Sequence, residues 1–323
     1  MALYGPAGFY SSGGRAGRRG DFITSPEVGP LFGAVLSRRI DAEWRRQGEP
    51  DVFDVIEVGA GPGTLARSIA AARSAVAQAG ALRYTGVETS SSQRTLHPEG
   101  ITSLESMPSR VRNGMVVGNE LLDNLPFRLA VWDDGWREAY VTERGGKWVE
   151  VLLPFDVLPP SLPVSGVPHG ARAPVQDAAA SWVRDALALL DDGCVLVFDY
   201  CVGVTAELAL RPWREWLRTY RQQQRGVHYL NQPGTQDITT EVCVDQLILA
   251  AGEPDSVRSQ AQWLSVWGID ELVAEGRQWW EEKSSAPDLR AMTGRSRVRE
   301  AEALCDPSGL GSFTVLEWTT TRS

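Results

Sequence analysis

The stretch "DVFDVIEVGAGPGTLARSI", residues 51–69, joins a short apolar run to a helical segment through a turn with three glycines. The run before the turn is dense in β-branched residues, which is typical of a buried strand. The segment after it, residues 64–80, predicts a helix that is closed by Gly80. The sequence therefore predicts a strand, a glycine turn and a helix, which is a unit of α/β folds.

The spacing of the turn glycines indicates a bound cofactor. Gly59, Gly61 and Gly63 permit a tight turn and a close approach of a ligand to the backbone. A dinucleotide-binding loop needs Gly or Ala where this chain has Thr64. Glu57, two residues before the first glycine, would repel a pyrophosphate but suits a cofactor with a sulfonium and an α-ammonium group. The pattern resembles motif I of class I S-adenosylmethionine (SAM) methyltransferases.

A second acidic residue supports a nucleoside cofactor. Glu88 lies at the end of the next predicted strand, 25 residues after Gly63. An acid at this place accepts hydrogen bonds from ribose hydroxyls in both cofactor families. Glu88 therefore does not choose between them, and the alternative remains an ordinary turn whose glycines serve packing alone.

The rest of the chain continues the alternation of strands and helices. Residues 82–90, 113–119 and 194–201 are further predicted strands, and residues 180–193 are helical. Residues 135–153 predict a hairpin around Gly145 and Gly146. We expect a class I, Rossmann-like α/β fold with a mostly parallel sheet, helices on both faces and a smaller substrate-side lobe.

The chain divides into four expected parts. Residues 1–48 are a loop and a helix that flank the cofactor site, and residues 49–201 are the Rossmann-like core with a Pro-rich surface insertion at 153–176. Residues 202–300 are expected to build the substrate-side lobe, and residues 301–323 a strand that returns to the core sheet.

Ser25 and Pro26 predict the start of a helix that runs to about Gln47. Serine is a preferred N-cap, and proline is favoured at the first helical position. A second segment, residues 211–225, has basic residues interleaved with Trp213, Trp216 and Tyr220, and we interpret it as an amphipathic helix.

The composition excludes several kinds of protein. A net charge of -9 and a pI of about 5.0 disfavour nonspecific nucleic-acid binding. The four cysteines and three histidines have no metal-binding spacing, so we expect no metal site. No signal peptide or membrane-spanning run is evident, and we expect a soluble, cytoplasmic protein without membrane partners. A homodimer is left open.

The chain resembles the MidA-like family of SAM-dependent methyltransferases over nearly its whole length. Mitochondrial members of that family assist respiratory complex I assembly and act as protein arginine methyltransferases. The matching segments are "GFY" (8–10), "GDFITSPEVGPLFG" (20–33), "IEVGAGPGTLARSI" (56–69), "GNELLDNLPF" (118–127), "FDYC" (198–201), "GVHYLNQPGTQDITTEV" (226–242), "QAQWLSVWGI" (260–269) and "DPSGLGSFTVLEW" (306–318).

The chain also departs from the family. Asn124 replaces an alanine, Cys201 replaces a glycine, and the helices that precede "GFY" in the family have no counterpart in the printed sequence. These departures leave the cofactor interpretation intact and weaken the transfer of a particular substrate.

The resemblance implies SAM as cofactor, S-adenosylhomocysteine (SAH) as product, and a set of cofactor-binding residues. In the family the segment around Thr24, Ser25 and Pro26 lies beside the cofactor, and we expect backbone amides at Pro26–Glu27 to meet the cofactor carboxylate. The cofactor-binding residues assigned on this basis are Thr24, Pro26, Glu57, Gly59, Gly61, Gly63, Glu88, Leu104 and Asn119.

The candidate catalytic residues are Glu120, Asp123 and His228. Glu120 and Asp123 are three residues apart, so at a helix start they would share a face and could grip a guanidinium. The alternative is that Asn119 caps this helix and that the acids favour its positive end. His228 lies in a family-like motif as a substrate-site group or base, although a lone histidine is more often structural.

Four functions remain open at this point. The first is a SAM-dependent methyltransferase that acts on a nitrogen or oxygen acceptor, which the resemblance suggests is a protein arginine. The others are a small-molecule O- or N-methyltransferase of biosynthesis, a noncatalytic assembly factor that retains the fold, and an NAD-dependent oxidoreductase. Thr64 and Glu57 count against the oxidoreductase.

Overall fold

The computed structural model describes residues 24–221 and 224–321, so the segments 8–10 and 20–23 of the sequence analysis lie outside it. Its centre is a seven-stranded sheet in which β3, β2, β1, β4 and β9 run parallel, while β16 lies antiparallel between β9 and β15. In sheet order the strands are β15 Ser256–Ser259, β16 Thr314–Thr321, β9 Leu190–Asp199, β4 Val111–Asn119, β1 Phe53–Val58, β2 Leu82–Val87 and β3 Thr102–Leu104.

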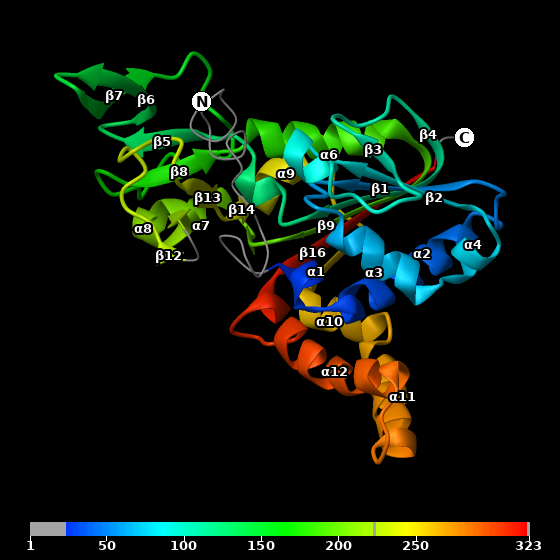
Figure 1. The fold of residues 1–323 in the computed structure, drawn as a ribbon. Helices are drawn as coiled ribbons and strands as arrows, with labels where there is room; N and C mark the ends of the chain where they lie inside the picture. The colour runs from blue at the N-terminus through cyan, green and yellow to red at the C-terminus, as the bar shows by residue number, and fades with distance from the viewer. Residues whose placement is uncertain (1–23, 222–223, 322–323) are drawn as a thin grey trace.

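Helices cover both faces of this sheet (Figure 1). The apolar residues of one face and its helices form the larger core, and α6 and α9 close the other face. The larger core contains α2 Pro30–Arg46, α3 Thr64–Ala72, α4 Ala75–Gln78, α10 Gln260–Val266, α11 Ile269–Lys283 and α12 Leu289–Leu304. The opposite helices are α6 Asp177–Leu189 and α9 Val244–Ala251. The expected fold class is therefore confirmed.

A second, antiparallel layer lies beside the central sheet (Figure 1). Its four strands follow the order β7-β6-β5-β8, and the turn at Gly145–Gly146 has positive φ at both glycines, which favours a two-residue hairpin. The strands are β5 Arg128–Trp132, β6 Trp136–Arg144, β7 Lys147–Pro154 and β8 Arg172–Val175. The predicted hairpin is confirmed.

The remaining elements are short. They include the three-stranded sheet β12-β11-β13 and the parallel pair β10–β14. These elements are α1 Ser25–Val28, α5 Ser91–Arg94, a 3-10 turn Leu122–Asn124, β10 Cys201–Val202, α7 Thr205–Leu210, α8 Trp213–Trp216, β11 Leu217–Arg221, β12 Gln224–Arg225, β13 Asp237–Thr240, β14 Val242–Cys243 and a 3-10 turn Leu310–Ser312. In the described part of the chain, no helix is both long and apolar enough to span a bilayer.

Four predicted helices are wrong in extent. The helix expected over 180–193 is α6, which spans Asp177–Leu189, and residues 190–193 begin β9 instead. The helix expected from Ser25 to Gln47 is broken into α1 and α2 at Gly29, where an added Cβ would lie 2.3 Å from the Glu300 carboxyl carbon. The helix expected over 64–80 ends at Arg73, which has a φ of +53°. Residues 217–221 form β11 because they pair with β13, so tertiary pairing overrides the amphipathic pattern there.

Residues 202–300 do not form one lobe, contrary to expectation. Residues 205–221 and 226–240 contact the antiparallel layer, whereas α9 packs on the central sheet and β15 is an edge strand of it. The α11–α12 hairpin projects from the opposite side of the molecule (Figure 1).

Candidate active site

A cavity of about 340 Å³ opens at the carboxyl ends of β1, β2 and β4. In doubly wound sheets this is the edge where ligands bind. Gly59 and Gly61 lie on its wall with φ angles of +74° and +51°, and an added Cβ on Gly61 would meet nothing within 4 Å. The glycine turn therefore leaves room for a ligand beside its backbone.

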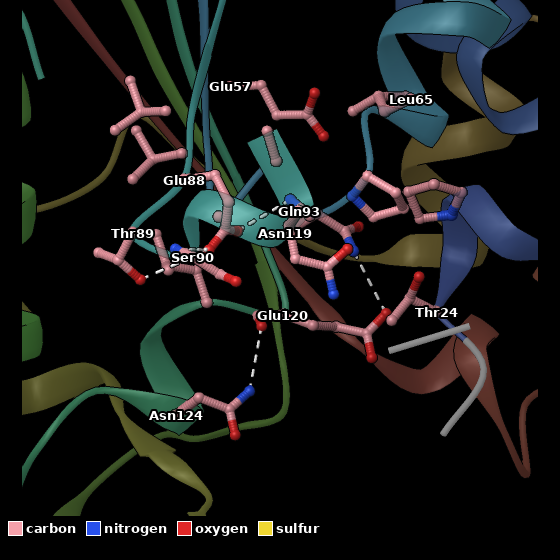
Figure 2. A pocket seen from close by; sticks show the side chains of 18 of the residues that line it. Thr24, Glu57, Leu65, Glu88, Thr89, Ser90, Gln93, Asn119, Glu120 and Asn124 are labelled. Atoms are coloured by element: carbon pink, nitrogen blue, oxygen red, sulfur yellow. Dashed lines mark hydrogen bonds between the residues drawn. The ribbon is translucent and has the colours of Figure 1, made fainter. Parts of the chain in front are cut away.

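The Glu88 side chain connects the glycine turn that follows β1 with the loop that follows β2 (Figure 2). The Gly61 N–H donates to Glu88 Oε2 at 3.0 Å, and the Ser90 N–H donates to Oε1 at 2.8 Å. Oε1 also accepts from the Thr89 hydroxyl at 3.4 Å, so Oε2 is the oxygen that keeps a further lone pair for a ligand hydroxyl. The position agrees with the expected ribose-binding role, although Glu88 also orders the glycine turn itself.

Glu57 forms the floor of the cavity and is 5% exposed. The Tyr84 hydroxyl donates to its Oε2 at 2.7 Å. Burial raises the pKa of Glu57 to about 8, and the nearby charge of Glu88 adds to this shift. A cationic group in the cavity would favour the ionised form of Glu57.

The α1 segment forms the opposite wall through Thr24, Pro26 and Glu27. Ser25 is not an N-cap, contrary to expectation, because Thr24 holds that position and the Ser25 hydroxyl donates to Gln260 instead. The Ser25 N–H donates to Glu120, proline has no N–H, and the Glu27 N–H donates to the Thr24 carbonyl. The amides expected to meet a cofactor carboxylate are therefore already used.

Asn119 and Glu120 end β4 at the centre of the site, between Thr24 and the Glu88 loop in Figure 2. Glu120 has a φ of +50°, and its Oε1 accepts from the Ser25 N–H at 3.2 Å and from Asn119 Nδ2 at 3.3 Å. Burial and the charge of Asp123 raise the pKa of Glu120 to about 8. Asn119 does not cap the next turn, whose N-cap is Leu121.

A second cavity of about 190 Å³ adjoins the first and shares Glu120 and Asn124 with it. The second cavity is rich in carboxylates, and we call it the acidic cavity. It is lined by Glu120, Asp123, Asn124, Tyr200, Trp216, Arg218, Tyr220, Asp237, Thr239, Thr240 and Glu241. The charge of Arg218 is shared with Glu241, whose carboxylate lies 3.4 Å away.

Asp123 is held at the base of the acidic cavity. It does not share a helix face with Glu120, since Glu120 precedes the 3-10 turn that contains Asp123, yet both side chains line this cavity. Asp123 Oδ2 accepts from the Thr239 hydroxyl at 2.7 Å. Burial and the neighbouring Asp199 raise the pKa of Asp123 well above its ordinary value. The buried carboxyls of Asp123 and Asp199 therefore favour sharing one proton.

Three predicted residues do not reach either cavity. Gly63 faces Pro98, whose Cδ lies 2.8 Å from where a Cβ would be, and serves the turn itself. Leu104 ends β3, and its carbonyl accepts from the Glu88 N–H, whereas the next residues line the cavity. His228 stacks on Tyr229 at 4.3 Å in a separate hollow and is not brought to Glu120.

Most of the acidic cavity and part of the cofactor cavity wall consist of residues that were not predicted from the sequence. Gln93 and Trp182 line the first cavity, and Tyr200, Asp237 and Thr239 line the second. Tyr200 and Asp237 occur in motifs that were already quoted, "FDYC" and "GVHYLNQPGTQDITTEV". Tyr200 directly follows β9 and Asp237 begins β13, and the tertiary structure brings both to the acidic cavity.

The first cavity fits SAM. Asn119 Oδ1 and the Trp182 indole N–H are buried on its wall and lack hydrogen-bond partners within the described residues, so a ligand would satisfy them. Glu57 can face the cationic groups and Glu88 the ribose hydroxyls. Bound there, SAM would supply a methyl group activated on a sulfonium. Within residues 24–221 and 224–321 no group of His, Cys, Asp or Glu could hold a metal ion.

The fold and this cavity define a class I SAM-dependent methyltransferase. A family model with the description "Putative S-adenosyl-L-methionine-dependent methyltransferase" matches residues 35–261. The chain belongs to this family, in agreement with the MidA-like resemblance of its motifs.

Solved structures support the same assignment. A crystal structure of a Burkholderia thailandensis protein bound to S-adenosyl-homocysteine is 28% identical with a TM-score of 0.82, and the match covers 99% of this chain and 85% of that one. The cofactor is therefore SAM.

Curated relatives carry a more specific name. The Drosophila melanogaster protein named protein arginine methyltransferase NDUFAF7 homolog, mitochondrial, is 31% identical over 42% of this chain, and the match spans 38% of that protein. The Danio rerio protein named protein arginine methyltransferase NDUFAF7, mitochondrial, is 24% identical over 98% of this chain and 81% of its own length.

Proposed function

We propose that the protein transfers a methyl group from SAM to a nitrogen of a positively charged acceptor, and that this acceptor is a guanidinium of protein arginine. The observation that carries the proposal is the carboxylate-rich cavity that meets the cofactor cavity at Glu120. Glu120, Asp123 and Asp237 outnumber the cation Arg218 on its wall. Carboxylates bind a guanidinium by paired, charge-assisted hydrogen bonds.

The size of the acidic cavity supports a single side chain as the occupant. At about 190 Å³ it is smaller than the roughly 300–1,000 Å³ of typical small-molecule sites. An arginine side chain of a protein could enter it while the rest of the substrate stays outside. The names of the relatives agree with this class of acceptor.

The residues of this chain would act mainly by position. Glu120 lies where the two cavities meet, so it can orient an acceptor nitrogen toward the cofactor cavity. A guanidinium must lose a proton once it is methylated, and the cluster of Glu120, Asp123 and Asp199 can hold that proton.

The identity of the labelled product tests this proposal. Purified protein is incubated with methyl-tritiated SAM and total cell protein, and the labelled protein is hydrolysed and separated by chromatography. We expect label in methylarginine. Label that appears only in methylated hydroxyl or carboxyl groups, or only in the small-molecule fraction, would contradict the guanidinium assignment and favour the small-molecule alternative.

A further inference from the structure

The backbone and the hydroxyl of Ser25 connect two parts of the molecule that are far apart in the sequence. Ser25 is fully buried, and its hydroxyl donates to Gln260 Oε1 at 2.9 Å. Its N–H donates to Glu120 Oε1 at 3.2 Å. The same residue therefore contacts the Glu120 carboxylate on one side and the start of α10 on the other.

The orientation of the Gln260 amide is fixed by its other contacts. Gln260 is fully buried, lies in neither cavity wall, and donates from Nε2 to the Leu304 carbonyl at 3.0 Å. Its backbone N–H donates to the Phe313 carbonyl at 2.7 Å. Because a carbonyl can only accept, Nε2 must point to Leu304, and Oε1 must point to Ser25.

The α1 segment depends on such contacts for its position. It has only four residues, too few for a helix that is stable by itself, and its N-cap makes no side-chain hydrogen bond. The adjoining α2 begins with the Leu31 N–H on Glu300 Oε2 at 2.8 Å. Gln260 and Glu300 therefore fix the two ends of a wall that includes Thr24 and Pro26 of the cofactor cavity.

We propose that Gln260 is a positioning residue, which holds Ser25 so that α1 closes the cofactor cavity and the Ser25 N–H keeps Glu120 at the junction of the two cavities. The part about Glu120 rests on the proposed function, whereas the part about α1 concerns cofactor binding alone. The "QAQWLSVWGI" motif thereby receives a physical role for its first residue.

Calorimetric titration of SAH into Gln260→Leu, Ser25→Ala and the double variant tests the first part. Leucine keeps the approximate volume of the side chain and removes both polar contacts. We expect each single variant to bind SAH about tenfold more weakly, since a lost buried hydrogen bond displaces the wall. The double variant should be no weaker than the weaker single variant, because both substitutions break one contact.

A matched control separates position from general stability. Gln246 is a buried glutamine of α9 that also bridges backbone and side-chain groups, with Nε2 on the Pro174 carbonyl and the Thr205 hydroxyl, and it lies in neither cavity wall. Gln246→Leu should lower the melting temperature and leave SAH affinity within about twofold of the parent protein.

The pH profile of methyl transfer tests the second part. Loss of the hydrogen bond from the Ser25 N–H disfavours the ionised form of Glu120 and raises its pKa. The pH profile of methyl transfer should therefore shift to higher pH in Gln260→Leu and stay unchanged in Gln246→Leu. If SAH affinity responds as expected while the parent protein methylates no arginine, the proposed function fails and the positioning role of Gln260 stands.

Three outcomes would overturn the proposal. They are parental SAH affinity in folded Gln260→Leu, single-variant losses that multiply in the double variant, and an equal loss of SAH affinity in Gln246→Leu. If Gln260→Leu does not fold, Ser25→Ala decides alone, because it removes only one hydroxyl, and parental SAH affinity in that variant would overturn the proposal.

Discussion

The two cavities that meet at Glu120 are built in different ways. The cofactor cavity is formed by loops that directly follow β1, β2 and β4, and backbone atoms of the glycine turn contribute much of its wall. The acidic cavity is formed by side chains from the 3-10 turn at 122–124, from residue 200, and from β11 and β13, which pair antiparallel. One is local in sequence and the other is assembled from distant segments.

This difference separates two kinds of sensitivity to mutation. Backbone geometry dominates the cofactor side, so we expect the gravest losses there from substitutions at glycine. Charge dominates the acceptor side, so we expect shape-preserving changes of charge to act there. Glu120 belongs to both, and its positive φ is an uncommon conformation that its surroundings must hold.

Gly61→Val should have the largest effect on cofactor binding. Valine is β-branched and would be strained at a φ of +51°, and its side chain would enter the space beside the turn. We expect SAH affinity to fall by at least about 1,000-fold, or about 4 kcal/mol, in a calorimetric titration.

Gly80→Val is the matched control for this glycine. Gly80 has a φ of +74°, has nothing within 4 Å of an added Cβ, and is not part of either cavity wall. It should cost stability and leave SAH affinity unchanged. Equal losses of affinity in both variants would show that strain alone explains the effect and would remove the special status of the glycine turn.

Glu120→Gln should separate the two cavities. Glutamine keeps the oxygen that accepts from Ser25, but unlike the Glu120 carboxyl it cannot ionise when a cation binds at the junction. We expect methyl transfer to arginine to fall about 100-fold, because truncating a charge partner of a bound cation costs a few kcal/mol, while SAH affinity stays within about threefold. A proportional loss of both would assign Glu120 to cofactor binding alone.

The sequence could indicate residues of the cofactor cavity wall where their placement depends on local features. Gly59, Gly61 and Glu88 follow strands, Glu57 and Asn119 lie at the ends of β1 and β4, and all five line the cavity. A parallel sheet brings the ends of its strands to one edge, so these residues could be placed together without knowledge of distant contacts.

The sequence could not predict contacts made between distant segments. Serine is a residue type that favours N-cap positions. The Ser25 hydroxyl nevertheless donates to the buried amide oxygen of Gln260, which lies 235 positions later. Residues 217–221 have a helical pattern, yet β13 provides a strand partner. Gly29 is required by the close approach of Glu300 from α12, which no local pattern indicates.

The pH dependence of SAH binding should report Glu57. The ordinary value of its pKa is 4.5, and burial raises it to about 8, so the folded protein holds a proton on Glu57 at neutral pH. If the ionised form binds the cofactor ammonium, SAH affinity should rise about fivefold from pH 7 to pH 8, and binding at pH 7 should release a proton. Calorimetry in two buffers of different ionisation enthalpy measures this release.

Two variants assign the released proton. Glu57→Gln should abolish the rise of SAH affinity with pH, whereas Glu120→Gln, whose carboxyl also has a pKa of about 8, should retain it. Retention of the rise in Glu57→Gln and its loss in Glu120→Gln would reverse the assignment and would place the cofactor ammonium near the junction of the cavities.

His228→Ala should have the smallest effect on function, because His228 lies in neither cavity. Its ring stacks on Tyr229 and accepts from the Leu230 N–H at 3.2 Å, so the free energy of unfolding should fall by about 1 kcal/mol in urea denaturation at pH 8. Burial lowers the pKa of His228 below its ordinary value of 6.5. The folded parent protein therefore loses stability as the pH falls from 6.5 towards the lower pKa of the folded state. Alanine does not titrate, and the stability difference should shrink at pH 5.5.

Methyl transfer and SAH affinity of His228→Ala should stay within about twofold of the parent protein at pH 8. A tenfold loss of transfer with normal SAH affinity would instead bring the hollow at Trp213 and Tyr229 into the acceptor site, and the acidic cavity would then be only one part of it.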